Sequence, residues 1–373
     1  VTPEKFSFIF AGKAAQFYNL FVSLGLCFFL LKISEIIRPN RPSYKIASLL
    51  LLGLLPVYYK TFAFVRGEPT LVFFMLAATY QLLHILFVRR EFRTIDTLAL
   101  GGWLGLMILS RQWGFFFFPA VVIYIVILTL KEKPYSLSLL KMAVVSFIIA
   151  AVVGGWFYLV LQVKYGSLTA FNRTPIPFSF TNQPKDFYFG LGLDEVFDNP
   201  VRPAFPNQFI PTFYSETWGD YWGYFTITKL ELFGKEPQRR SYLGRVNLVS
   251  LPASAILLAG FMLGSIYLFI LVFTQFNRAH TQINGLALFP IIITISLIGY
   301  FWFQIRFPHI VDGETIKATY MLHIFPFLAM LGGELIERAR EKNSYFYVLL
   351  LILLGLTILH NISVMLSRFP FLV

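Results

Sequence analysis

Five basic residues stand near the ends of apolar stretches, on the side of the chain where few cations are expected. Loops on the outer side of a membrane are normally poor in Lys and Arg. One interpretation is snorkelling, in which each side chain reaches from a helix end to the headgroup region. The other is a shared anion site, because cations in a low dielectric bind a phosphate or pyrophosphate strongly. The residues are Lys60, Arg66, Arg111, Arg306 and Lys317.

The segment around Arg66 also carries a carboxylate. Gly67, Glu68 and Pro69 follow it, and a Pro suits the first turn of a helix because its missing N–H costs nothing there. Glu68 could orient the guanidinium of Arg66. It could equally be a carboxylate that the dipole of a helix favours at the N-terminus.

A second group of polar residues lies in the aromatic segment 214–225, which holds two carboxylates. Glu216 or Asp220 could act as a base, and Trp218, Tyr221 and Trp222 could stack on sugar rings as an acceptor platform. The alternative is an amphipathic helix lying on the membrane surface. That alternative accounts for the aromatic residues better than for Asp220.

The composition decides which elements must position these residues. Of 373 residues, 57% are hydrophobic and only 13% are charged, about half the share of roughly 25% in a soluble domain. The chain is therefore expected to be an all-α polytopic membrane protein. Its net charge of +12 is explained by basic cytoplasmic loops, and no nucleic-acid partner is expected.

The single Cys27 and the lack of a His or Cys cluster predict that the chain has no tightly bound metal. A loosely held divalent cation on carboxylates stays an open alternative.

Ten apolar stretches are long enough to cross a bilayer, so about ten transmembrane helices are expected. Basic residues in alternate short loops place those loops in the cytoplasm and segment 162–248 outside. Segment 162–248 is rich in Pro, Asn, Gly and aromatic residues, which predicts an ordered, irregular loop with short helices. The predicted spans are 14–33, 44–60, 68–88, 95–110, 115–131, 138–161, 249–274, 284–304, 317–336 and 345–366.

These spans divide the chain into three regions. Residues 1–161 form an N-terminal region of six spans, 162–248 an external loop region, and 249–373 a C-terminal region of four spans. This topology puts Val1 outside, although no signal peptide is present. We therefore expect one further span and an external loop upstream, giving about eleven spans.

Three motifs and this topology resemble the GT-C superfamily of glycosyltransferases, which use polyprenyl-phosphate-linked sugars. The branch resembled is that of the protein O-mannosyltransferases and the aminoarabinose transferases. The motifs are the Arg66-x-Glu68 entry to the apolar helix 71–77, the Gly-rich span 100–106 that leads to Arg111, and 316–322 with Lys317 and Pro326. Together and in order they cover most of the chain.

The resemblance implies a GT-C-like fold and a membrane glycosyltransferase that acts on the external or lumenal face. A sugar would pass from a polyprenyl phosphate to an acceptor protein or glycolipid, as in protein glycosylation or cell-envelope assembly, among membrane lipids. Arg66, Arg111 and Lys317 would hold the donor phosphate, with Arg306 and Lys60 beside them. No cofactor is required.

The family's catalytic carboxylate lies in the first external loop, which is expected upstream of this sequence. Glu216 and Asp220 are weaker candidates for that role. The membrane would be a prokaryotic plasma membrane or the endoplasmic reticulum. The alternative function is a non-catalytic GT-C-like subunit of a larger membrane complex. A transporter or flippase is less favoured, because its charges are expected near the middle of the bilayer.

Overall fold

The computed structural model describes residues 3–64, 66–131, 136–168, 175–202, 204, 206–223, 236–274, 281–310 and 313–366. In these ranges the chain forms helices and loops, and no strand is found. Eight of the helices described are long and apolar enough to cross a membrane. The chain is therefore an integral, multi-pass, helical membrane protein.

The N-terminal region is a series of long helices with short links. Its elements in chain order are α1 (Pro3–Ile37), α2 (Pro42–Gly53), α3 (Pro56–Phe62), α4 (Glu68–Leu83), the π-helix η1 (His84–Arg89), α5 (Thr94–Ser110), the 3-10 helix η2 (Gln112–Phe116), α6 (Phe117–Lys131), α7 (Ser136–Ala150), the π-helix η4 (Ala151–Gly155) and α8 (Trp156–Tyr165).

The rest of the chain begins with short helices and continues with long ones. Its elements are η5 (Phe180–Asn182), α9 (Lys185–Phe189), α10 (Leu193–Asp198), α11 (Phe209–Trp218), α12 (Glu236–Val249), α13 (Leu251–Phe273), α14 (Thr281–Leu286), α15 (Leu288–Arg306), the 3-10 helix η7 (Ala318–Ile324), α16 (Phe325–Lys342) and α17 (Ser344–Leu366). The predicted boundary at 248 falls at the junction of α12 and α13, and α8 extends four residues past the predicted boundary at 161.

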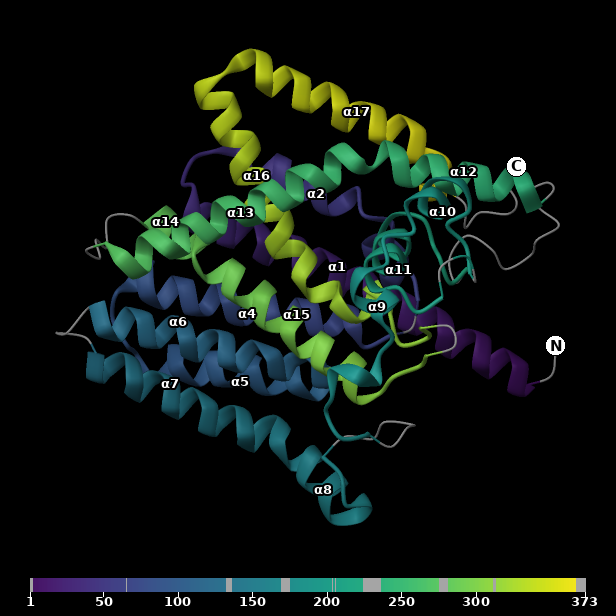
Figure 1. Ribbon diagram of the computed structural model, residues 1–373. Helices are drawn as coiled ribbons and strands as arrows, with labels where there is room; N and C mark the ends of the chain where they lie inside the picture. The colour runs from purple at the N-terminus through teal and green to yellow at the C-terminus, as the bar shows by residue number, and fades with distance from the viewer. Residues whose placement is uncertain are drawn as a thin grey trace.

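The two ends of the helix bundle differ in composition. Helices α9, α10 and α11 gather at one end, at the right of Figure 1, where α1 begins and α17 ends. We call this the loop end. The opposite end holds the turns 38–41 and 90–93 and the last turn of α16 with residues 338–342, and we call it the basic end. The predictions that the basic end is cytoplasmic and the loop end external rest on the charge of these turns.

The structure changes the predicted second span. The stretch 44–60 is not one helix, because α2 and α3 meet at an angle of 76°. Pro56 begins α3, and a Pro cannot continue the hydrogen bonding of a preceding helix, so the chain bends at this point. The predicted fourth span, α5, has 17 residues and is shorter than the eight long helices. The number of ten crossings stays a prediction.

Small residues allow two pairs of helices to approach closely. A Cβ added at Gly105 on α5 would lie 2.5 Å from Cβ of Val153 in η4. One added at Gly260 on α13 would lie 2.5 Å from the backbone N of Gly332 on α16. Helices in membranes pack through such contacts. The Gly-rich stretch of α5, which contributed to the family resemblance, therefore also has a packing role.

An ionic network joins α1, α13 and α16 at the basic end. The Glu334 carboxylate is fully buried and accepts two hydrogen bonds from the guanidinium of Arg38, at 2.8 and 2.9 Å. It also accepts from Nε of Arg338 at 2.8 Å and from the hydroxyl of Tyr267 at 2.9 Å. This network connects helices that are distant in sequence.

Candidate functional site

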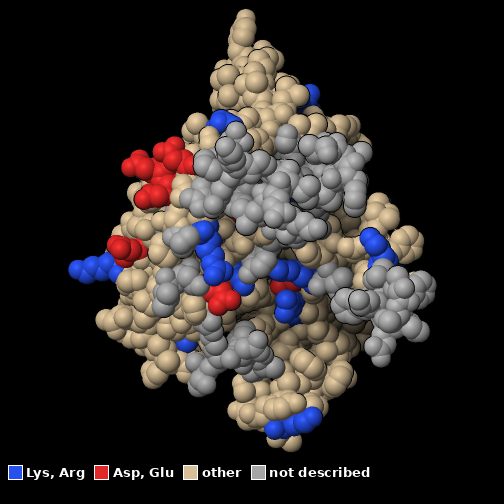
Figure 2. Space-filling view, turned by 90° about the vertical axis from the view of Figure 1, so that its right-hand side faces the viewer, with Lys and Arg blue, Asp and Glu red and all other residues tan. Residues whose placement is uncertain are grey.

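Three links from distant parts of the sequence meet at the loop end. They are the α3–α4 link with Arg66, the α5–η2 link with Arg111, and the start of η7 after Lys317. Nη1 of Arg66 donates a hydrogen bond to Oγ1 of Thr319 at 3.2 Å, which joins the first link to the third. Figure 2 shows this end of the molecule, where basic and acidic side chains gather near the centre of the face.

Glu68 joins the first link to the second. Its carboxylate is fully buried, and Oε1 accepts a hydrogen bond from Nη2 of Arg111 at 2.7 Å. The links are so close that a Cβ added at Gly67 would lie 2.8 Å from the backbone O of Ser110. The sequence predicted that Glu68 could orient the guanidinium of Arg66. In the structure Glu68 binds the guanidinium of Arg111 instead, because the α5–η2 link lies beside the start of α4.

Lys317 lies against aromatic rings. Its Nζ is 5.8 Å from the ring centroid of Trp222 and 6.0 Å from that of Tyr320. Such contacts stabilise a cation by the ring quadrupole without neutralising it. Nε1 of Trp222 donates to the backbone O of Ile316 at 2.9 Å and so fixes the indole beside Lys317. The positive charge of Lys317 is thus held in a defined position.

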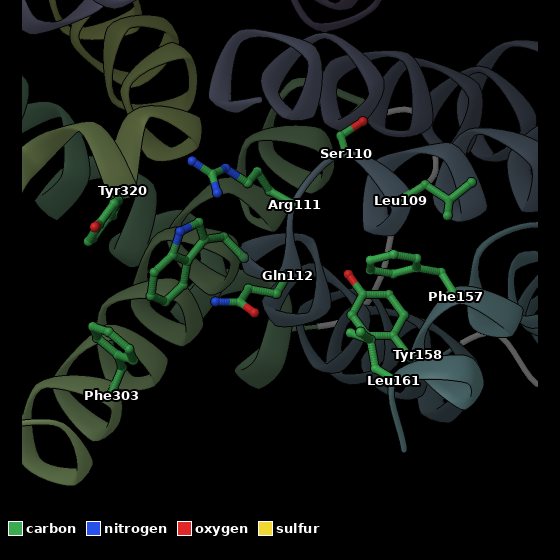
Figure 3. A pocket seen from close by; sticks show the side chains of 10 residues that line it. Leu109, Ser110, Arg111, Gln112, Phe157, Tyr158, Leu161, Phe303 and Tyr320 are labelled. Atoms are coloured by element: carbon green, nitrogen blue, oxygen red, sulfur yellow. The ribbon is translucent and has the colours of Figure 1, made fainter. Parts of the chain in front are cut away.

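Arg111 also borders a cavity of about 480 Å³ between α5, η2, α8, α15 and η7. Figure 3 shows Arg111 and Gln112 between Tyr320 and Phe303 on one side and Phe157, Tyr158 and Leu161 on the other. The cavity therefore combines one guanidinium with aromatic and aliphatic walls. Its lining residues are Leu109, Ser110, Arg111, Gln112, Trp113, Phe157, Tyr158, Leu161, Phe303 and Tyr320.

The two carboxylates of the aromatic segment lie at the end of α11. Glu216 and Asp220 are 1% and 2% exposed. The backbone N–H of Trp222 donates to Oε2 of Glu216 at 3.2 Å, whereas Oε1 is buried without a hydrogen-bond partner. Asp220 has φ of 117°, a conformation that strains a residue with a side chain and that recurs at functional sites.

The electrostatic surroundings of Glu216 connect it with the cations. Burial raises the pKa of Glu216 well above its ordinary value, and the charge of Asp220 raises it further. The Trp222 amide, Arg66 and Lys317 act in the opposite direction. Glu216 is therefore within electrostatic range of two of the predicted phosphate-binding residues.

The predicted acceptor platform is not an open surface. Trp218, Tyr221 and Trp222 are only 2%, 1% and 8% exposed, because α11 and the turn after it pack into the protein interior. Their rings cannot stack on a sugar in this arrangement. The same burial excludes the alternative of a helix lying on the membrane surface. Two further aromatic residues of that segment, Tyr224 and Phe225, lie outside the described residues.

The other two predicted cations occupy different surroundings. Lys60 is 2% exposed on α3, which packs against α11 and η7, so its side chain lies in the protein interior. The guanidinium of Arg306 lies 5.6 Å from the ring of Trp302, a residue that is 46% exposed at the end of α15. This position of Arg306 fits snorkelling beside an interfacial aromatic residue.

Several residues of the site were missed in the sequence. Thr319 and Tyr320 adjoin Lys317, and their polar side chains next to a predicted cation were an available signal. Phe157 and Tyr158 lie within the predicted span 138–161, where nothing in the sequence distinguishes a cavity wall from a lipid-facing surface. Only the packing of α8 against η2 makes that distinction.

Within the described ranges, no three His, Cys, Asp or Glu side chains are grouped to hold a metal ion. The loosely bound divalent cation stays a prediction. No family model, no characterised protein sequence and no solved structure matches this chain.

Proposed function

We propose that this chain is a membrane glycosyltransferase that takes a sugar from a polyprenyl-phosphate donor and acts at the loop end. The observation that carries the proposal is that the links bearing Arg66, Arg111 and Lys317 meet at one end, where Arg111 lines a cavity of mixed polar and aromatic lining. A polyprenyl-phosphate sugar has both features that such a site would bind, a phosphate and a long apolar chain. The family resemblance of the sequence supports the same substrate class.

The proposed reaction breaks the bond between the anomeric carbon and the phosphate oxygen. An acceptor oxygen attacks that carbon, and the bonding electrons leave with the polyprenyl phosphate. Arg66, Arg111 and Lys317 would stabilise the negative charge that develops on the phosphate. Glu68 would hold the Arg111 guanidinium in place. A carboxylate must take the proton of the acceptor. Glu216 and Asp220, the candidates from the sequence, are 1% and 2% exposed, so neither faces an acceptor in this arrangement.

The test is a transfer assay with the purified chain in lipid vesicles. Radiolabelled polyprenyl-phosphate hexoses and pentoses would be supplied as donors, together with extracts of acceptor proteins and glycolipids. We expect Arg66→Ala to lower transfer at least about a hundredfold, as loss of one donor to a developing anion does elsewhere. Arg306→Ala is the matched control, because it removes the same charge from the same end of the molecule at the Trp302 position.

Two results would contradict the proposal. If Arg66→Ala transfers sugar as fast as the control Arg306→Ala and the unaltered chain, Arg66 is not part of a donor site and the proposed site is wrong. If the unaltered chain transfers no sugar from any donor but copurifies with other membrane proteins, the non-catalytic subunit is favoured.

A further inference from the structure

A second large pocket lies at the basic end, away from the site described above. It has a volume of about 710 Å³ and is bounded by the last turns of α1, the turn to α2, and the ends of α4 and η1. The two candidate spans that flank it end at Ile37 and Arg89. The pocket is therefore at the depth where the apolar part of both helices stops and lipid headgroups begin.

Three cations and one carboxylate line this pocket. Lys32 has its Nζ 5.5 Å from the ring centroid of Phe28, and it forms no ion pair within the described residues. Arg38 is fixed by its two hydrogen bonds to Glu334, and its side chain stays 14% exposed. The carboxylate is Glu35, which forms an ion pair with Lys45. The lining thus has an excess of positive charge, part of it held rigidly.

The third cation, Arg41, is exposed, as Lys32 is. Its side chain is 44% exposed, and its ion pairs to Glu341 and Glu337 are long, at 3.3 and 3.9 Å. Exposed pairs of this kind contribute little to stability. The guanidinium of Arg41 can therefore turn towards an anion in the pocket at small cost.

The opposite wall is apolar, with aromatic and polar groups at its rim. Phe87 and Val88 of η1 belong to it, and Val88 is 53% exposed. The rings of Tyr80 and His84 pack together with centroids 5.4 Å apart and add hydrogen-bonding groups. A ligand that fits must carry an anionic group on one side and an apolar chain on the other.

We propose that this pocket binds the phosphate headgroup of an anionic glycerophospholipid, with the acyl chains against η1. Basic pockets between transmembrane helices at headgroup depth are suited to such lipids. The exposed side chains of Lys32 and Arg41 can reorient towards the phosphate, whereas the guanidinium of Arg38 is fixed by Glu334. The site is separate from the proposed donor site and does not depend on that function.

The experiment is native mass spectrometry of the purified full chain in detergent. The probes are phosphatidylglycerol, phosphatidylcholine with the same acyl chains, and inorganic phosphate. We expect phosphatidylglycerol to bind more tightly than phosphatidylcholine. Lys32→Gln should weaken binding of phosphatidylglycerol roughly fivefold, and Lys32→Gln with Arg41→Gln more than about tenfold. Lys342→Gln, an exposed lysine at the same end that does not line the pocket, is the matched control and should bind as the unaltered chain does.

Three outcomes would overturn the proposal. Equal affinity for the two phospholipids would show that the pocket does not select an anionic headgroup. Equal weakening by Lys342→Gln would assign the effect to the overall surface charge. Displacement of phosphatidylglycerol by inorganic phosphate at a similar concentration would make the ligand a free ion. Circular dichroism checks that each variant is folded, and the single variant Lys32→Gln removes no ion pair of the described structure.

Discussion

The two ends of this protein use their buried charges differently. At the basic end, Glu334 is surrounded by Arg38, Arg338 and Tyr267, which satisfy both of its oxygens. At the loop end, Glu68 and Glu216 each have one carboxylate oxygen buried without a hydrogen-bond partner. The hydrogen-bonding capacity of Glu334 is therefore better satisfied than that of Glu68 or Glu216.

The cations differ in the same way. Arg38 and Arg338 at the basic end contact carboxylates, whereas Lys317 at the loop end lies over two aromatic rings. Ring contacts occur at both ends, since Arg338 also lies 4.9 Å from the ring centroid of Tyr267. The Glu334 network therefore contributes mainly to stability, whereas the proposed transfer reaction depends on the loop end. Substitutions at the two ends should therefore affect different measurements.

The largest effect is expected for Glu334→Gln. The substitution leaves two guanidinium groups beside a neutral amide, and breaking a buried ion pair in this way costs about 3–5 kcal/mol. The free energy of unfolding, measured by denaturant titration in detergent, should fall by about that amount. Glu341→Gln, which removes a carboxylate that is 30% exposed, should cost less than about 1 kcal/mol. Equal losses of stability in the two variants would contradict the view that the buried Glu334 network stabilises the protein more than the exposed Glu341 pairs do.

At the loop end, Lys317→Gln should act mainly on transfer. We expect a rate roughly a hundredfold lower, because one of the cations that stabilise the leaving phosphate is lost. The free energy of unfolding should fall less than in Glu334→Gln, because the contacts of Lys317 with the rings of Trp222 and Tyr320 are worth only about 0.5–1 kcal/mol each. Lys317→Arg keeps the charge and should retain most of the rate. A large loss of stability with unchanged transfer would place Lys317 in the same class as Glu334.

A smaller effect is expected from filling the cavity beside Arg111. Leu109→Trp adds bulk to a wall of this cavity and should slow transfer from long-chain polyprenyl donors about tenfold. Short-chain donors should be affected less, because they need less of the apolar space. Rates measured with donors of two chain lengths check this. If both donors slow equally, the cavity does not hold the lipid chain.

The smallest effect concerns the pH dependence of stability. The pKa of Glu216 is raised in the folded chain, so its contribution to stability is complete below the unfolded pKa and is lost as the pH rises through the folded pKa. The melting temperature of the unaltered chain should therefore fall between mildly acidic and alkaline pH. Glu216→Gln removes this titration, so the melting temperature of the variant should depend less on pH. In terms of the free energy of unfolding, the difference between the two proteins should be about 1 kcal/mol per pH unit in the range where Glu216 titrates. Parallel curves for the two proteins would indicate that Glu216 does not titrate in this range.

Much of the fold was predictable because membrane insertion depends on local composition. The apolar stretches marked the long helices, and Pro, Asn and Gly in 162–248 predicted a region of short helices and turns. The bend at Pro56 was not predicted, although a Pro inside an apolar stretch is a known signal for one. The number of crossings does not follow from the sequence alone, because the length of an apolar stretch does not reveal such bends.

The candidate site was predictable only in part. Arg66, Arg111 and Lys317 were found because cations are rare in short outer loops, which is a local rule. Their mutual arrangement depends on which helices pack together, and a single sequence does not specify that packing. Trp218, Tyr221 and Trp222 were expected on an open surface but are buried. The sequence does not distinguish the two positions, because aromatic residues occur both in a protein core and at a binding surface.

The sequence by itself determined that this is a helical, multi-pass membrane protein and identified residues with the charge to bind a phosphate. These properties follow from hydropathy and charge, which are sums over neighbouring residues. Tertiary structure alone decided that Glu68 binds Arg111, that Trp218 is buried, and that Lys32 and Arg41 line a pocket with η1. The physical reason is that burial and pairing are set by contacts between segments that are distant along the chain.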